Sequence, residues 1–198
     1  GFQLTFFRTA LHPEGGGSER NSSWAAGQVY MAHFALTDVG ERRFYTFERF
    51  SREAVNLAGA NVRPFHVWLD DWYVEGQAEG SATGKGMAMR LRAEEDGIGI
   101  DLRLRSEKPA VLHGEKGLSK KGAGLGNASY YYSLTRLETA GQIDVKGKRF
   151  EVDGFAWMDR EWSTSVLDER ARGWDWFALQ LSDGTELMCY DIRLENGE

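Results

Sequence analysis

Hydrophobic and polar residues alternate with a period of two along most of this chain, which is typical of strands that bury one side in a sheet. The segment 154–162 shows the pattern most clearly, and its side chains divide between two faces. One face carries Phe155, Trp157, Asp159 and Glu161, and the other carries Ala156, Met158, Arg160 and Trp162. Two carboxylates are therefore predicted to lie on the same side of one strand as a tryptophan.

The same pattern predicts further strands, which are separated by glycine-containing turn signals. We expect strands at 1–10, 28–37, 43–50, 65–74, 87–93, 98–105, 128–137, 143–145, 150–152, 173–181 and 186–193. Asp96-Gly97 and Lys146-Gly147 are predicted hairpin turns, and Asp183-Gly184 is predicted to be a two-residue one. Residues 109–127 are predicted to be a long irregular loop, of a length often found in lids and binding loops.

One short helix is expected in this chain. Ser51 is a good N-cap and Glu53 suits the first helical turn, so the helix is predicted over Ser51–Leu57. The chain has no series of helices that could connect parallel strands, which excludes a βαβ architecture. The pattern predicts an all-β fold, with an antiparallel sheet closed into a barrel or folded as a flattened barrel or sandwich.

The composition suits one β domain with a sizeable core, since the 198 residues are 41% hydrophobic. A net charge of −6 gives no basic excess, so no nucleic-acid partner is expected. No apolar run of about 18 residues occurs, so we expect no transmembrane segment. The compartment is left unknown, and it is periplasmic or secreted if an export signal precedes Gly1. Cys189, the single cysteine, is expected to pack in the core.

Motifs that identify catalysis by their spacing are missing from the sequence. It has no Gly-x-Ser-x-Gly elbow, no phosphate-binding loop and no His-Glu-x-x-His. The four histidines are far apart and lack the spacing of metal ligands, so neither a metal nor a cofactor is expected. His33 lies in an apolar strand, where it is either a hydrogen-bonded core residue or else a ligand or an acid.

Asp159 and Glu161 form the clearest candidate for chemistry. Side chains two residues apart on a strand face lie roughly 6 to 7 Å apart, and retaining glycosidases hold their carboxyl groups about 5 to 5.5 Å apart. A hydrolytic pair is therefore geometrically possible. The alternative is structural, with Arg160, Arg172 and Arg193 neutralising the two carboxylates.

Aromatic residues are concentrated around this pair, since four of the seven tryptophans fall within 154–193. They either form a large aromatic core or line a cavity for a hydrophobic ligand. The residues predicted to line such a cavity are Tyr130, Tyr132, Trp157, Trp162, Trp174 and Trp176. Gln180 is added as a ligand contact because it shares the predicted face of Trp174 and Trp176.

Segments with a distinctive sequence are found along essentially the whole chain. They include GFQLTFFR (1–8), HFALTD (33–38), Ser51-Arg52 with LAGA (57–60), VWLDDW (67–72), KPAVLHGEKGLSKKG (108–122), NASYYYSLTRL (127–137), GFAWMDREW (154–162) and GWDWFALQLSDGTELMCY (173–190). Together they resemble the AttH-like lipocalin-related family, whose relatives include the carotenoid 1,2-hydratases (hydroxyneurosporene synthases). The resemblance implies a lipocalin-like (calycin) β-barrel that binds or processes a hydrophobic ligand such as a lipid, an isoprenoid or a carotenoid-like molecule. It also implies a role in the metabolism of such molecules.

The resemblance further implies that residues 1–198 are one lipocalin-like domain of a longer protein. Family members carry an additional strand before this segment and a second lipocalin-like domain after it, which we expect as a partner within the same chain. In the hydratase relatives, the strand similar to 157–162 has a His-Asp-His-Asn-Trp motif, whose acid protonates a terminal double bond before water adds. This chain keeps Asp159 and Trp162 but has Met158, Arg160 and Glu161 in place of the two histidines and the asparagine.

Asp159 is the expected acid or base with Glu161 as its partner, and Tyr190 or Asp191 on the returning strand is the expected orienting group. The candidate ligand contacts beyond the aromatic residues and Gln180 are His33, Arg52 and Arg160. The sequence leaves open whether the domain is a carrier, a hydratase, or a hydrolase such as a sandwich-type glycosidase.

Overall fold

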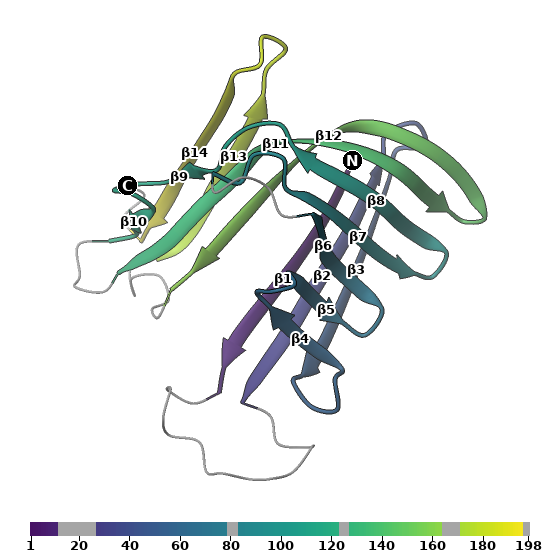
Figure 1. The fold of residues 1–198 in the computed structure, drawn as a ribbon, viewed down its shortest axis with the longest axis horizontal. Helices are drawn as coiled ribbons and strands as arrows, with labels where there is room; N and C mark the ends of the chain where they lie inside the picture. The colour runs from purple at the N-terminus through teal and green to yellow at the C-terminus, as the bar shows by residue number, and fades with distance from the viewer. Residues whose placement is uncertain (12–26, 79–82, 123–126, 164–170, 196–198) are drawn as a thin grey trace. The chain divides into compact units, whose positions relative to one another are not determined.

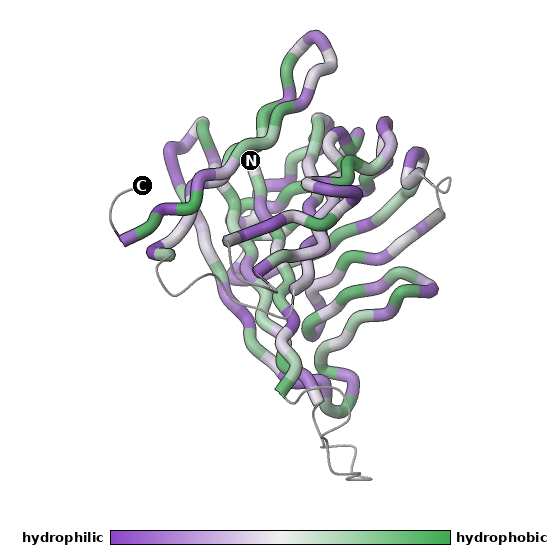
Figure 2. The backbone as a smooth tube through the Cα atoms, turned by 90° about the vertical axis from the view of Figure 1, so that its left-hand side faces the viewer, coloured by the Kyte–Doolittle hydropathy of each residue, from purple (hydrophilic) through white to green (hydrophobic). Residues whose placement is uncertain are grey.

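The computed structural model describes residues 1–11, 27–78, 83–122, 127–163 and 171–195. These residues form fourteen β-strands and no helix (Figure 1). Hydrophobic and hydrophilic residues alternate along many of the strands (Figure 2), as the sequence pattern predicts. The predicted all-β antiparallel fold is confirmed.

The strands form three sheets. The first sheet has the order β1-β2-β3 and consists of β1 (Phe2–Ala10), β2 (Gln28–Asp38) and β3 (Arg43–Arg52). The second has the order β10-β11-β8-β7-β6-β5-β4, and β9 and β12 also pair with β11. Its strands are β4 (Ala58–Asn61), β5 (His66–Leu69), β6 (Trp72–Ala78), β7 (Ala88–Glu95), β8 (Ile98–Ser106), β9 (Val111–Leu112), β10 (Leu118–Lys120), β11 (Ala128–Val145) and β12 (Lys148–Trp162). The third sheet is the hairpin of β13 (Ala171–Gln180) and β14 (Glu186–Leu194).

The chain divides into two compact units. The first contains residues 1–78, 88–104 and 140–153, and the second contains residues 79–87, 105–139 and 154–198. The long strands β11 and β12 contribute one part to each unit. The predicted Asp159 site falls entirely within the second unit.

An aromatic cluster forms part of the core of the first unit. One face of β2 is buried, and Phe34 on that face packs against Phe47 and Trp72 with ring centroids 5.8 Å apart in each case. The indole nitrogen of Trp72 donates a hydrogen bond to the carbonyl of Glu94 at 3.0 Å. Arg49 lies over the Trp72 ring at 4.3 Å, so this cation contacts the aromatic core directly.

The prediction of a helix over Ser51–Leu57 is wrong. Ser51 and Arg52 continue β3 and pair with Tyr30 and Val29 of β2. Beyond the strand, Val55 has a positive φ of 47°, which a right-handed helix does not contain. Strand pairing therefore outweighs the local N-cap signal of Ser51, because the cap contributes only about 1 kcal/mol.

Two other predicted segments also differ from the structure. The segment expected to be one strand at 65–74 is a hairpin, because Asp70 adopts a positive φ of 53° and Leu69 pairs with Trp72. The stretch expected to be irregular at 109–127 contains β9 and β10, and both pair with β11. These additions bring His113 and Lys121, which follow the two short strands, close to β11.

The β13–β14 hairpin forms as predicted, but its turn is longer than two residues. The amide of Leu181 donates a hydrogen bond to the carbonyl of Thr185 at 2.8 Å, which closes a three-residue loop. Gly184 takes a φ of 86° at the loop position where glycine is favoured. Cys189, expected to be buried, is exposed because it lies opposite Phe177 on the outward face of the hairpin.

Side chains attach this hairpin to the rest of the second unit. The side chain of Glu186 is 7% exposed. Its carboxylate pairs with the ammonium group of Lys108 and with Nε of Arg136, at 2.5 Å in each case. The side-chain amide of Gln180 donates to the carbonyls of Thr135 and Ala156 at 2.7 and 3.0 Å. Because a two-stranded hairpin is only marginally stable alone, these bonds determine where the hairpin lies.

Replacing Glu186 with glutamine should lower the free energy of unfolding by about 3 kcal/mol, because two partly buried cations lose their shared anion. Denaturant titration followed by tryptophan fluorescence measures the change. Glu138→Gln is the matched control, since Glu138 is exposed on β11, and it should change stability by less than about 0.5 kcal/mol. Equally small effects of the two substitutions would contradict the role given to Glu186.

Candidate functional site

The site is built from facing residues of β11 and β12. Ser129, Tyr131 and Ser133 follow one another on the buried face of β11, with exposed fractions of 2%, 4% and 0%. Asp159 and Glu161 of β12 receive hydrogen bonds from these side chains. The two carboxylates predicted to share a strand face therefore lie against a row of hydroxyl groups.

Asp159 is held through one of its two carboxylate oxygens. The hydroxyl of Tyr131 donates to Oδ1 at 2.9 Å, the indole nitrogen of Trp157 donates to it at 3.0 Å, and the hydroxyl of Ser133 also donates to it. Among the described residues, no donor contacts Oδ2. Asp159 is an exposed residue, and Oδ2 is its oxygen without a donor among the described residues.

Tyr131 connects Asp159 to the β13–β14 hairpin. Its hydroxyl accepts a hydrogen bond from the indole nitrogen of Trp176 at 3.2 Å while donating its own proton to Asp159. The rings of Trp157 and Trp176 meet edge to face at 6.3 Å. Burial, together with the nearby charge of Asp159, raises the pKa of Tyr131 to about 12. Tyr131 is therefore a protonated donor at neutral pH.

His113 also belongs to this group, although the sequence analysis did not select it. Its Nε2 lies 2.7 Å from the hydroxyl oxygen of Ser133, and its ring lies 4.2 Å from that of Tyr131. Burial lowers the pKa of His113 below its usual value of 6.5. No motif marks this histidine in the sequence, because its place depends on the pairing of β9 with β11.

Glu161 has a different environment from Asp159. It forms an ion pair with Lys121 at 2.8 Å and accepts a hydrogen bond from Ser129 at 2.5 Å. The ammonium group of Lys121 also lies over the rings of Tyr131 and Tyr190, at 5.1 and 4.6 Å. Lys121 and Glu161 thus form a charged pair beside the Asp159 cluster.

The two candidates on the returning strand point to opposite sides of it. The Tyr190 hydroxyl lies 3.4 Å from the hydroxyl of Ser119, so this side chain faces the Asp159 cluster. Asp191 is exposed and pairs in register with Asp175 across the hairpin. Tyr190 is therefore near the carboxylates, whereas Asp191 lies on the opposite face of β14.

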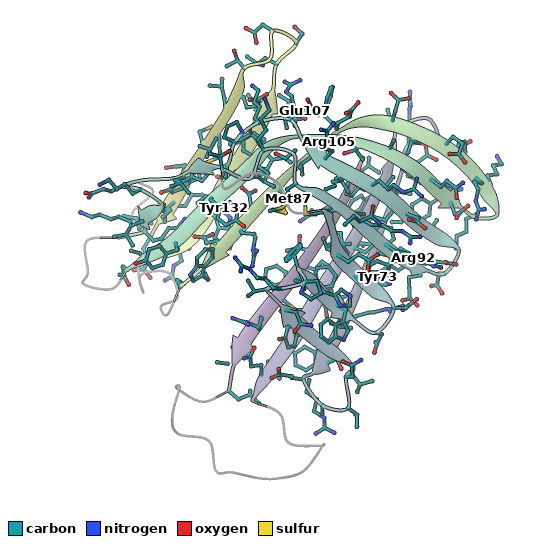
Figure 3. The ribbon with its side chains drawn as sticks, in the orientation of Figure 1. Tyr73, Met87, Arg92, Arg105, Glu107 and Tyr132 are labelled. Atoms are coloured by element: carbon teal, nitrogen blue, oxygen red, sulfur yellow. The ribbon has the colours of Figure 1, made fainter. Side chains whose placement is uncertain are left out.

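The aromatic candidates separate into two groups on different faces of β11 and β12. Tyr130 stacks on Trp162 with centroids 5.9 Å apart, and Tyr132, labelled in Figure 3, meets Trp162 edge to face at 6.2 Å. Arg160 donates a hydrogen bond to the hydroxyl of Tyr132 at 3.3 Å. This group faces away from Asp159, because its β12 members alternate with Asp159 and Glu161.

The remaining candidates have separate positions. Trp174 is 60% exposed on β13, and Gln180 acts as an anchor of the hairpin. His33 and Arg52 belong to the first unit, where His33 pairs with Glu48 at 3.0 Å and its side chain is 40% exposed. The described part of the chain contains no cluster of three or more metal-ligating side chains. It also contains no helix of the length and apolarity needed to span a membrane.

Comparison with known proteins agrees with this architecture. A family model described as AttH-like matches residues 1–198. The chain belongs to the AttH-like family. A crystal structure from Nitrosomonas europaea, described as an AttH, is 36% identical in sequence and superposes with a TM-score of 0.82. The match covers 100% of this chain and 56% of the Nitrosomonas chain. The second lipocalin-like domain that the resemblance implies stays a prediction.

A more distant structure supports the fold alone. Kievitone hydratase from Nectria haematococca is 17% identical in sequence and superposes with a TM-score of 0.57. The match covers 86% of this chain and 53% of the hydratase chain. The lipocalin-like fold expected from the sequence is confirmed. A comparison with functionally curated proteins finds no match.

Tyr131 should ionise well above the usual range of a tyrosine as the pH rises. Its raised pKa stabilises the folded protein below pH 10, and this contribution should be lost between about pH 10 and 12. Phenolate absorbance measured against pH should include a late transition near 12. Tyr131→Phe should remove the contribution of one tyrosine to that transition, whereas Tyr130→Phe should keep it. An amplitude near pH 12 that is unchanged in Tyr131→Phe would contradict the burial of Tyr131.

Proposed function

We propose that this domain binds a hydrophobic small molecule and adds water to one of its carbon–carbon double bonds, with Asp159 carrying the proton. The observation that supports this most directly is the asymmetry of the Asp159 carboxylate. Three donors hold Oδ1, and Oδ2 has none among the described residues. An oriented acid with one accessible oxygen is what proton transfer to a bound alkene requires.

A single carboxyl group is enough for the hydration, because it can both give a proton to the alkene and take one back from the added water. Protonated Asp159 gives its Oδ2 proton to one alkene carbon, and water adds to the cation that forms on the other. The added water then returns a proton to Oδ2, so the product gains one water and the acid is restored. The indole rings of Trp157 and Trp176 lie beside Asp159, and aromatic faces attract a developing cation.

The hydrogen-bond donors to Asp159 are neutral side chains. They differ from the histidines that flank the aspartate in the hydratase motif. Met158 and Arg160, which stand in place of those histidines, lie on the other face of β12. Tyr131, Ser133 and Trp157 instead supply the hydrogen bonds to the carboxylate. The hydratase role therefore rests on Asp159 and its own donors.

Two alternatives remain, with different degrees of support. A carrier without a reaction is favoured by the exposed aromatic face, where Tyr130 is 55% and Trp162 is 52% exposed. Hydrolysis by a pair of Asp159 and Glu161 has less support, because Glu161 already binds Lys121 and Ser129. The choice between hydratase and carrier is decided by whether a bound alkene gains water.

Asp159→Asn should slow hydration strongly while leaving ligand binding intact. The probes are geranylgeraniol and oleic acid, which are long alkenes with a neutral and an anionic head. Mass spectrometry should detect a product heavier by one water with the unaltered protein. The Asn variant should form it at least about 10²-fold more slowly, because a general acid typically contributes 10²–10⁴-fold. Tryptophan quenching measures binding separately.

Asp153→Asn is the matched control, since Asp153 is exposed on the same face of β12, six residues before Asp159. It should leave both hydration and binding unchanged. Binding of either probe without product would favour the carrier. Equal hydration rates in the Asp159 and Asp153 variants would show that Asp159 does not carry the proton.

A further inference from the structure

A continuous hydrogen-bonded path joins His113 to Asp159 through Ser133. The Ser133 hydroxyl has one proton, which it donates to Oδ1 of Asp159, and its side chain is fully buried. Its oxygen must therefore accept, rather than donate, in the 2.7 Å contact with Nε2 of His113. This arrangement requires the neutral imidazole to carry its proton on Nε2.

The groups facing His113 come from three segments of the chain. Tyr131 of β11 covers its ring, Asp159 and Glu161 of β12 raise its pKa, and Lys121 after β10 lowers it. Burial is the largest effect, and the net result is a pKa below 6.5, so the ring is mainly neutral at pH 7. Among the described residues, no side chain or backbone group bonds to Nδ1, and His113 is only partly buried.

We propose that His113 is a proton-relay residue that exchanges the proton of Asp159 with solvent through Ser133. The proposal rests on the proposed function, because a hydration acid needs its proton restored whenever the proton of the added water escapes to solvent. His113 does not contact the substrate in this scheme. It acts through Ser133, and so it is a positioning residue for the acid.

The relay conserves protons at every step. A solvent proton binds Nδ1 of His113, the Nε2 proton passes to the oxygen of Ser133, and the hydroxyl proton of Ser133 passes to Oδ1 of Asp159. The carboxylate becomes a carboxylic acid, and a half-turn about its Cβ–Cγ bond places the new proton at the Oδ2 position, where the hydration step uses it. The imidazole is left neutral with its proton on Nδ1, and the reverse sequence unloads the acid and restores the proton on Nε2.

A purely structural role for His113 makes different predictions. The histidine would then fix the segment after β9 against β11, an attachment that the amide of His113 already makes to the carbonyl of Tyr131 at 3.1 Å. Any polar side chain of similar size would serve that purpose. Glutamine at position 113 keeps hydrogen bonding but cannot titrate or exchange tautomers, so it separates the two roles.

Side-chain nitrogen NMR of the whole chain tests the path without any substrate. In the unaltered protein, His113 should be the Nε2–H tautomer, and Asp159→Asn should lower its pKa, because the carboxylate raises it. Ser133→Ala should produce a mixture of tautomers, whereas Ser133→Thr, which keeps the hydroxyl, should retain Nε2–H. An Nδ1–H tautomer in the unaltered protein, or a tautomer indifferent to Ser133→Ala, would overturn the relay.

Kinetics with geranylgeraniol provide the second test. His113→Gln and Ser133→Ala should each lower kcat by roughly tenfold or more, with KM little changed, and should alter the pH profile of kcat. Ser133→Thr should restore most of the rate. Unchanged kcat and pH profile in His113→Gln would contradict the relay, whereas absence of hydration in the unaltered protein would contradict the proposed function. In that case the NMR titration still decides whether the path exists.

Discussion

The attachment of the β13–β14 hairpin through side chains is the constraint on which the site depends. In the described structure this hairpin forms its own two-stranded sheet, so its place is set by Glu186, Gln180 and Trp176 rather than by a ladder of backbone bonds. Trp176 donates to Tyr131, and Tyr131 donates to Asp159. Loss of the hairpin's anchors would therefore disturb the carboxylate that carries the proposed chemistry.

The face of β11 that meets Asp159 is polar. The buried face of β11 presents hydroxyl groups at Ser129, Tyr131, Ser133 and Thr135 in succession, and at Thr139 beyond the buried Leu137. Buried hydroxyls need partners, and here the carboxylates of Asp159 and Glu161 supply some of them. The hydroxyls of Ser129, Tyr131 and Ser133 thus orient the two carboxylates.

Much of the fold could be predicted from the sequence because it depends on period-two patterning. The strands around 28–38 and 154–162 and the turn at Asp183-Gly184 follow from local signals. The false helix at Ser51 and the missed turn at Asp70 have another cause, since long-range pairing and a positive φ decided them. The shared face of Asp159 and Glu161 could be predicted, whereas His113 and Lys121 could not, because short strands distant in sequence bring them there.

A crystal structure of the Asp159→Asn protein grown with geranylgeraniol would show whether residue 159 meets the double bond, because the substitution should trap the alkene unreacted. We expect a double bond in van der Waals contact with the side-chain nitrogen of residue 159, which replaces Oδ2. Tyr131, Ser133 and Trp157 should still donate to Oδ1. Density for the ligand on the Tyr130–Trp162 face instead, with no ligand atom near residue 159, would contradict the role proposed for Asp159.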